Sequence, residues 1–247
     1  MSAYLIWRLL KFIAFALWGA GIFSLIKGFS QKGNLKTLYF LILPSFASLW
    51  ITGWLMMKLT EKTMAAPWIS NTMLFSLISL VASFQVAHSF KLQKIGKVIV
   101  TMGFSMATAS MIFRAPEQLP IGMGISLGIG VLLGFMLQKE IEDAEVDLTI
   151  IERGFTWVAW AEGLTVLVLF GVFMPFKYAL QINIDAGTGV IGWTHGVFVI
   201  LYVISLTYTK LALKWSWFDW FIGGAVSFFP LGTFWFERRM RKKQLRD

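Results

Sequence analysis

The sequence predicts an all-α fold: a polytopic bundle of about eight transmembrane helices. Hydrophobic residues make up 57% of the chain and charged residues only 14%, whereas a soluble domain carries about 25% charged residues. Apolar runs near the length of roughly 20 residues that crosses a bilayer recur along the whole chain. These runs are Leu9–Ile26, Leu38–Met57, Pro67–Phe90, Val98–Phe113, Leu119–Leu137, Phe155–Met174, Val190–Thr209 and Trp217–Phe236.

Each run is expected to be helical, because lipid offers the backbone no hydrogen-bonding partner and its polar groups must be satisfied within the segment. The runs also lack the alternating pattern of a membrane β-barrel strand. Arg8 and Lys11 stand at the start of the first run, but no small-residue cleavage site with a polar start follows it. The first run is therefore expected to be a retained span and not a signal peptide.

An even number of spans places both termini on the same side of the membrane. Lys and Arg residues are nearly balanced between the two sides, so the concentration of basic residues in the C-terminal tail decides the orientation. Such clusters favour the cytoplasmic face and contact anionic headgroups, so both termini are expected in the cytoplasm. The net charge of +9 then serves the membrane surface and not nucleic acid. The tail cluster consists of Arg238, Arg239, Arg241, Lys242, Lys243 and Arg246.

The fifth span is rich in glycine and predicts close helix packing. Gly124 with Gly128, and Gly130 with Gly134, form two small-xxx-small pairs, which let helix backbones approach closely. At about 100° per residue the two pairs fall on different faces of the helix. The span is therefore expected to lie between neighbouring helices.

A polar segment divides the chain. Gln138–Arg153 holds six of the thirteen acidic residues, and its apolar residues recur at the spacing of a short amphipathic helix. The predicted parts are a five-span part (1–137), this linker (138–153) and a three-span domain with the basic tail (154–247). The linker is either a solvated connection or a docking segment for a basic partner. Its acidic residues do not follow the spacing of a calcium loop.

Three polar residues inside the last spans form the candidate site: Glu162, His195 and Tyr202. Ionisable groups in hydrocarbon are costly and mark functional positions or buried partners. With the boundaries above, Glu162 and His195 differ in depth by about 10 Å, whereas Tyr202 lies within a residue or two of the depth of Glu162. A Glu162–Tyr202 hydrogen bond is therefore predicted. Glu162 serves as a structural tie between helices, as part of a proton or ion relay, or as a ligand-binding carboxylate.

The sequence leaves several roles possible for His195. It is a packing residue, or it bonds a backbone carbonyl that Pro230 leaves without its donor, or it joins a proton relay with Thr233 or Glu162. A haem or metal ligand is a further alternative. The second histidine, His88, lies about 20 Å away in depth, which argues against one iron held by both. Lys177, at the end of the sixth span, either snorkels to headgroups or binds an anion.

Soluble-enzyme signatures and cysteines are absent from the sequence, so no metal, cofactor or catalytic residue is expected. The enzyme question stays open, leaning to a protein without catalytic activity.

Residues from about 153 to 240 resemble a known family. Ordered motifs carry the resemblance: Arg153, Ala161-Glu162-Gly163, Met174-Pro175-Phe176-Lys177-Tyr178, His195-Gly196, Tyr202, Trp215, Ser227, Pro230-Leu231-Gly232-Thr233-Phe234 and Arg238-Arg239. They are similar to the YdzA-type three-span bacterial membrane domain of unknown function. The resemblance implies a bacterial inner-membrane protein and assigns no activity.

The first four spans are loosely similar to the copper-resistance and protoporphyrinogen-oxidase-like four-helix membrane families. Leu10-Lys11-Phe12, Trp18-Gly19, Gly53 and Trp68 carry this weaker likeness. Those families place a haem-ligating histidine in the first span, where this chain has none.

Three functional hypotheses follow. The first is a non-enzymatic structural or accessory subunit of a membrane complex, or a homo-oligomer, assembled through its spans. The second is a small transporter or proton-coupled channel using Glu162, Tyr202 and His195. The third is a haem- or quinone-linked redox protein.

Overall fold

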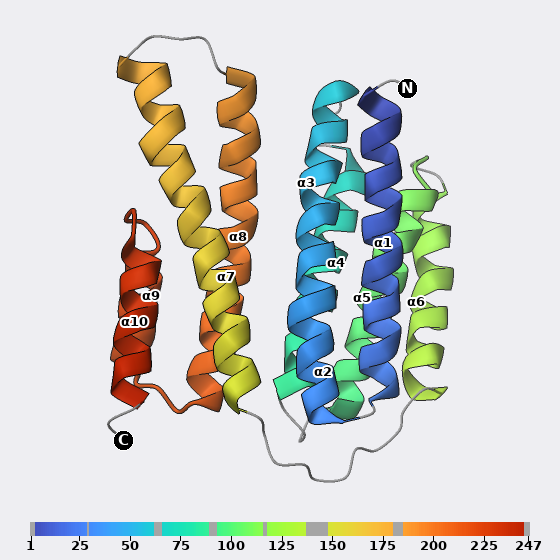
Figure 1. Cartoon of the computed structure of the whole chain (residues 1–247). Helices are drawn as coiled ribbons and strands as arrows, with labels where there is room; N and C mark the ends of the chain where they lie inside the picture. The colour runs from blue at the N-terminus through green and yellow to red at the C-terminus, as the bar shows by residue number, and fades with distance from the viewer. Residues whose placement is uncertain are drawn as a thin grey trace. The chain divides into compact units, whose positions relative to one another are not determined.

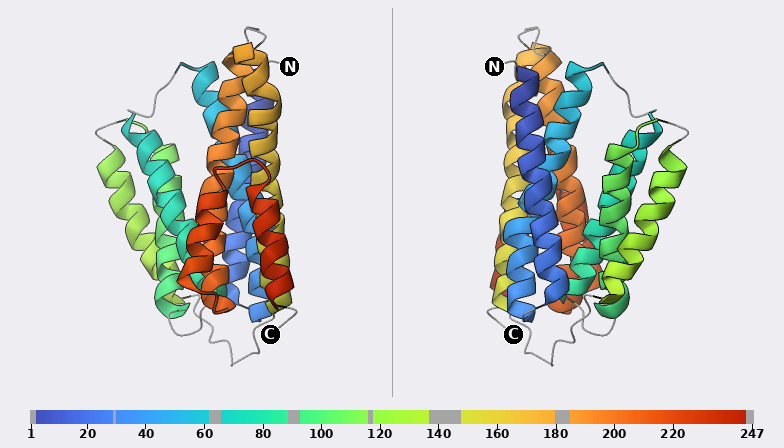
Figure 2. Two further views of the ribbon diagram at one scale, coloured as in Figure 1. Left: turned by 90° about the vertical axis from the view of Figure 1, so that its left-hand side faces the viewer. Right: turned by 90° about the vertical axis from the view of Figure 1, so that its right-hand side faces the viewer.

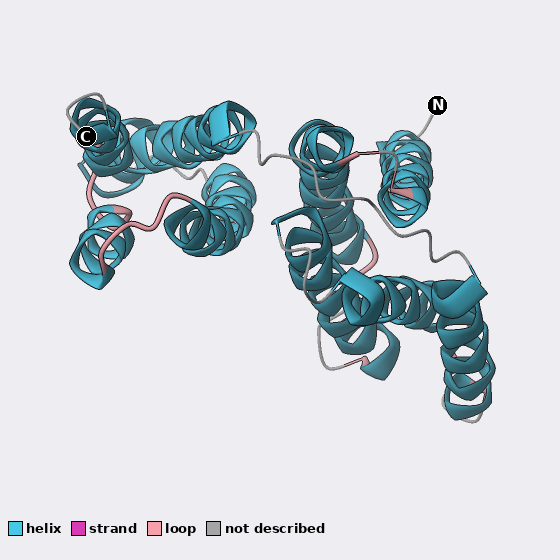
Figure 3. Cartoon of the chain, turned by 90° about the horizontal axis from the view of Figure 1, so that it is seen from below, coloured by secondary structure: helices cyan, strands magenta, loops and turns pink. Residues whose placement is uncertain are grey.

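The structure, a computed structural model, describes residues 3–28, 30–61, 66–88, 93–115, 118–136, 148–179 and 185–244. Every described element is a helix or a turn (Figure 3). Six helical stretches are long and apolar enough to cross a membrane, and the apolar helix at Leu119–Leu133 is shorter. The all-helical transmembrane fold is thereby confirmed. The chain divides into two compact units, Met1–Asp147 and Leu148–Asp247.

The N-terminal unit is an up-and-down arrangement of helices (Figure 1). Its helices are α1 (Ala3–Lys27), α2 (Gln31–Thr37), α3 (Leu43–Leu59), α4 (Pro67–His88), α5 (Gln93–Ile112) and α6 (Leu119–Met136). A π-helical turn at Leu38–Ile42 joins α2 to α3, so that they make one crossing, Lys32–Leu59. The polypeptide therefore crosses this unit five times.

Proline explains the π-helical turns. Leu38–Ile42 ends just before Pro44, and Leu169–Phe173 in the other unit ends just before Pro175. Proline has no N–H to continue the α-helical ladder, and a widened turn shifts the neighbouring hydrogen bonds. The Leu43 N–H accordingly bonds the carbonyl of Leu38, five residues back. Both long crossings stay continuous through their prolines.

Aromatic and small residues fill the core of the N-terminal unit. Trp18 of α1 is fully buried and meets Phe46 and Phe104 edge-on, with ring centroids 6.2 and 4.9 Å apart. Gly130 of α6 lies so close to α5 that an added Cβ would stand 2.7 Å from the Cα of Met102. Small residues therefore set the closest helix approach in this unit.

The C-terminal unit contains two long helices and one short helical hairpin (Figures 1 and 2). The helices are α7 (Leu148–Val168), α8 (Asp185–Ala212), α9 (Trp217–Val226) and α10 (Gly232–Gln244). The π-helical turns Leu169–Phe173 and Pro175–Ala179 extend α7. The crossing that contains α7 runs from Leu148 to Tyr178 and that of α8 from Gly189 to Ala212.

The predicted eighth span, Trp217–Phe236, was wrong as a single helix. At about 1.5 Å per residue, α9 and α10 are roughly 15 and 20 Å long, and each is too short for a hydrocarbon core of about 30 Å. Pro230 cannot continue α9, and Leu231 adopts a left-handed φ of 68° in the turn. Only glycine fits at Gly232, where a Cβ would stand 2.0 Å from the carbonyl oxygen of Val226.

The α9–α10 hairpin closes on a buried carboxylate. Asp219, in the first turn of α9, is 3% exposed and accepts a 2.7 Å hydrogen bond from Lys243, near the end of α10. Arg239 lies 4.0 Å from the other oxygen. Ser216 caps α9 by accepting from the Asp219 N–H and donating to its carboxylate. These contacts show that the two helices run antiparallel, so α10 returns to the end where α9 begins.

Candidate functional site

The structure brings Glu162 and His195 together inside the C-terminal unit. Glu162 on α7 is completely buried, and its Oε1 lies 3.9 Å from Nδ1 of His195 on α8. The His195 side chain is 20% exposed. The predicted 10 Å separation in depth was therefore wrong.

The error came from the helix ends. The first helix of the unit begins at Leu148, seven residues before the predicted start, and α8 begins at Asp185, five residues before its predicted start. Depths counted from the predicted boundaries placed both residues too close to the membrane surface. In the longer helices Glu162 lies near the middle of its crossing, and His195 lies ten residues after the start of α8.

Thr165 links the pair and was missed by the sequence reasoning. Its hydroxyl donates to the Glu162 carbonyl at 2.7 Å and lies 3.3 Å from Nδ1 of His195. A hydroxyl that donates to a carbonyl can still accept from the imidazole N–H. The i+3 spacing from Glu162, one turn along the same face, was the available signal.

The start of α10 packs against the same carboxyl. Thr233, which is 1% exposed, stands in the first turn of α10 beside Glu162. Gly163 permits this approach, because a Cβ there would stand 2.6 Å from the Thr233 hydroxyl. The first N–H groups of a helix lack partners and carry partial positive charge. The hairpin therefore presents a favourable environment for a carboxylate in the interior of the unit.

The Glu162 carboxyl is nevertheless incompletely satisfied. Among the described residues, neither of its oxygens accepts a hydrogen bond of normal geometry. The 3.9 Å approach of His195 exceeds hydrogen-bond distance. A buried carboxyl left in this state is costly.

Tyr202 has a structural role that differs from the predicted one. Its hydroxyl donates to the backbone carbonyl of Gly223 on α9 at 3.0 Å, and the predicted hydrogen bond to Glu162 does not form. The cause is the hairpin, which brings the α9 backbone against α8. Phe155 packs against Tyr202 and also contacts Trp215 and Phe236, which forms an aromatic cluster beside this bond. Tyr202 therefore ties α8 to the hairpin.

The carbonyl that Pro230 was expected to release is not available to His195. The Val226 oxygen accepts from the Phe229 N–H at 3.1 Å inside the turn. Lys177 lies in the π-helical turn that ends the α7 crossing, with its ammonium 5.7 Å from the centre of the Tyr178 ring. Its snorkelling and anion-binding roles both stay predictions.

His88 belongs to the N-terminal unit, and both of its ring nitrogens are engaged. Nε2 lies 3.2 Å from the Tyr39 hydroxyl and Nδ1 lies 3.0 Å from the Phe84 carbonyl. In the described part of the chain, no three His, Asp or Glu residues are grouped to hold a metal ion.

The glycines of α6 have different surroundings. Gly130 contacts α5, whereas no described neighbour lies within 4 Å of a Cβ built at Gly124 or Gly128. The surroundings of Gly134 lie outside the described residues. The first six residues of α7, 148–153, come from the predicted acidic linker, and 137–147 lie outside the described residues.

The basic tail is partly neutralised. Lys243 and Arg239 face Asp219, and Arg241 pairs with Glu237. Arg238 and Lys242 are exposed. Headgroup binding by the tail stays a prediction, and the ion pairs with α9 and within α10 were missed because they depend on the hairpin.

Comparison with known proteins identifies the family that the C-terminal unit matches. Residues 153–242 match the family described as "Domain of unknown function (DUF3817)". The chain is also similar to the "Uncharacterized membrane protein YdzA" of Bacillus subtilis (strain 168), with 31% identity over 85 residues, which are 34% of this chain and 85% of YdzA. No solved structure matches the chain significantly. The family resemblance expected for the C-terminal third is confirmed, and the matched residues contain Glu162, Thr165, His195 and Thr233.

Proposed function

Because the chain belongs to the family of YdzA and the DUF3817 domain, and because its matched region holds the Glu162–His195 pair, we propose that this polytopic membrane protein is a small proton-coupled transporter or channel. Glu162 and His195 are the residues that exchange the proton. Tyr202 holds the surrounding helices in place. Proton transfer suits this pair because a carboxyl and an imidazole can each gain and lose a proton.

The observation that carries the proposal is the fully buried Glu162 carboxyl, 3.9 Å from His195, whose oxygens accept no hydrogen bond of normal geometry from a described residue. A carboxyl kept only as a tie between helices would be paired, since an unpaired one costs stability. An imidazole beside a carboxyl is a common proton-transfer combination, and intramembrane ionisable residues commonly mark proton or ion pathways.

The geometry suggests how the proton moves. A small side-chain rotation or one bridging water closes the 3.9 Å gap between Oε1 and Nδ1. Thr165, 3.3 Å from the same nitrogen, holds the imidazole in place. Thr233 faces Glu162 from the start of a half-length helix, as in transporters whose broken helices end at a central site.

Proton flux into proteoliposomes tests the proposal. With purified protein and a pH-sensitive dye inside the vesicles, we expect Glu162→Gln to slow the flux about a hundredfold, the scale of a lost acid–base group. The matched control is Tyr202→Phe, which should leave the flux intact because it removes only the bond to Gly223. Wild-type protein without flux above empty vesicles would contradict the proposal.

A second candidate, an accessory subunit or homo-oligomer, is favoured by α6. A Cβ added at Gly124 or Gly128 meets no described neighbour, and the adjacent Ile121 and Ile125 are 68% and 58% exposed. Such a face suits a close helix partner in the membrane. Purification in mild detergent tests this function, and a monomer with no copurifying protein speaks against it.

We further propose that the membrane is the bacterial inner membrane and that the hairpin end of the C-terminal unit faces the cytoplasm. If the shorter apolar helix α6 crosses the membrane together with the four candidate spans of the N-terminal unit, five crossings there and two in the C-terminal unit leave the basic tail opposite the start of α1. Lys and Arg then divide as sixteen against six by position in the sequence, a bias that favours the cytoplasm for the larger group. The smaller group is Arg8, Lys11, Lys58, Lys62, Arg114 and Lys177.

This orientation replaces the expectation of two cytoplasmic termini. That expectation counted α9 and α10 as one crossing and left the basic residues nearly balanced.

A further inference from the structure

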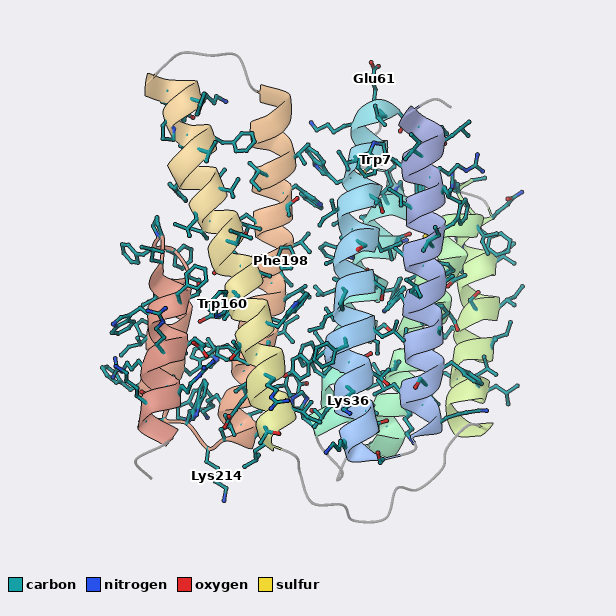
Figure 4. The ribbon with its side chains drawn as sticks, in the orientation of Figure 1. Trp7, Lys36, Glu61, Trp160, Phe198 and Lys214 are labelled. Atoms are coloured by element: carbon teal, nitrogen blue, oxygen red, sulfur yellow. The ribbon has the colours of Figure 1, made fainter. Side chains whose placement is uncertain are left out.

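A cavity of about 670 Å³ lies in the C-terminal unit, away from the Glu162–His195 pair. Residues near the beginning of α7, the end of α8 and the end of α10 line it. Figure 4 labels Trp160, one of its lining residues, on α7, and Lys214 at the end of the same unit. Its volume is in the range of small-molecule sites.

Two buried donors that line this cavity lack a partner. Thr209 is completely buried and Trp215 is 9% exposed. Among the described residues, neither the Thr209 hydroxyl nor the Trp215 indole N–H makes a hydrogen bond. Buried polar groups are nearly always paired in native proteins, so these two donors point to an oxygen-bearing ligand.

Around the cavity, one cation and one anion have no charged partner among the described residues. Glu237 is already engaged, because Thr156 donates to it at 3.1 Å and Arg241 pairs with it. Arg153 and Glu152 also line the cavity, and no ion pair or hydrogen bond from either side chain to a described residue is present. A ligand that matches this pair carries one negative and one positive group.

The location restricts the ligand further. Exposed Trp157 and Trp160 stand on the α7 side of the cavity, at 38% and 53% exposure. The crossing begins at Leu148, so Glu152 and Arg153 lie near its end, whereas Trp157 and Trp160 lie deeper along the same helix. The basic residues near the ends of α8 and α10 lie at the same end of the unit. The cavity thus lies where lipid headgroups are the most abundant amphiphiles.

We propose that this cavity binds a phospholipid with an ethanolamine headgroup. Its phosphate is bound by Arg153 and its ammonium by Glu152, while Thr209 and Trp215 donate to glycerol or ester oxygens. The acyl chains run along Trp157 and Trp160. An anionic lipid leaves Glu152 without a partner, and a choline headgroup has no N–H to donate to it. The site is independent of the proposed proton transfer.

The test is lipid retention by the purified full-length protein, measured by native mass spectrometry after exchange into phosphatidylethanolamine, phosphatidylglycerol or phosphatidylcholine. We expect selective retention of phosphatidylethanolamine. Thr209→Val removes one donor at nearly constant volume and should weaken retention about tenfold. Glu152→Gln should remove the preference over phosphatidylglycerol, and Arg153→Gln should weaken binding of all three lipids.

Lys214→Gln is the matched control, because Lys214 is a basic residue at the same end of the unit that does not line the cavity. Its retention should equal that of the wild type. The melting temperature in lipid-free detergent separates binding from folding: Thr209→Val should not lower it, because an unpaired buried hydroxyl is removed. Equal retention of the three lipids, or unchanged retention by Thr209→Val and Arg153→Gln, overturns the proposal.

Discussion

At the scale of single residues, the central feature of the C-terminal unit is the approach of Glu162 to His195 at 3.9 Å. Glu162 and His195 are conspicuous because ionisable residues are rare in apolar spans. Their contact depends on where α7 and α8 begin, and boundaries read from a sequence err by several residues. Each missed residue is about 1.5 Å of depth. Thr165 went unnoticed because its role depends on the imidazole of another helix.

Replacing Glu162 by Leu separates a functional carboxyl from a structural one. A carboxyl without a hydrogen-bond donor contributes no pairing energy, and an apolar side chain of similar volume avoids its burial cost. We expect Glu162→Leu to keep or raise the melting temperature in detergent while it abolishes proton flux. A drop of several degrees would indicate that the carboxyl holds the helices together.

At the scale of elements, the least predictable feature is the α9–α10 hairpin. Hydropathy reads Trp217–Phe236 as one apolar run, and Pro230 alone does not distinguish a kinked span from a turn. The decisive contacts join residues distant along the chain: Asp219 with Lys243, and Tyr202 with Gly223. The Ser216 cap was the local signal that a new helix starts there.

Asp219 makes the hairpin sensitive to acid. Burial alone raises the pKa of Asp219, but hydrogen bonds from Lys243 and Ser216 and the charge of Lys243 outweigh it and lower the pKa below the ordinary value of 3.8. A lowered folded-state pKa stabilises the protein above 3.8 and loses that contribution as the pH falls through the folded value.

We therefore expect the melting temperature of the wild type to fall more steeply below about pH 4 than that of Asp219→Asn. At pH 7 the variant should be less stable, because the buried ion pair and the cap are weakened. Thermal unfolding of both proteins between pH 7 and pH 3 provides the measurement. Parallel curves for the two proteins would rule out this role of Asp219.

Gly128 and Gly130 of α6 allow a controlled comparison of helix packing. A Cβ at Gly130 stands 2.7 Å from the Cα of Met102, whereas one at Gly128 meets no described neighbour. We expect Gly130→Ala to destabilise the protein by about 1–3 kcal/mol through overpacking, and Gly128→Ala to leave stability unchanged in the monomer. Chemical denaturation in detergent compares the two. A loss limited to Gly128→Ala would instead indicate that this glycine lies in an interface.

At the scale of the whole molecule, composition was sufficient for the membrane fold but not for sidedness. The number of Lys and Arg residues on each side depends on the number of crossings. If Trp217–Phe236 is counted as a span, the basic tail is assigned to the opposite side of the membrane. In the proposed topology, with α9 and α10 as a hairpin, the nearly even distribution becomes sixteen basic residues against six. An excess of Lys and Arg on one side of the membrane is needed to assign that side to the cytoplasm.

Single-cysteine labelling tests the number of crossings directly, because the natural chain contains no cysteine. Cysteine at Lys177 should react with an impermeant maleimide on intact cells, whereas cysteine at Lys214 or Lys242 should react only after lysis. Lys214 precedes the hairpin and Lys242 follows most of it. Labelling of these two positions from opposite sides would establish an eighth crossing.

The most direct test of proton transfer between Glu162 and His195 is the proton flux of Glu162→Gln, His195→Gln and the double variant, reconstituted at equal density. Residues that act as one unit give non-additive losses. We expect both single variants and the double variant to fall to the same low rate, while Tyr202→Phe retains wild-type flux. Wild-type flux in either single variant would contradict a proton route through this pair.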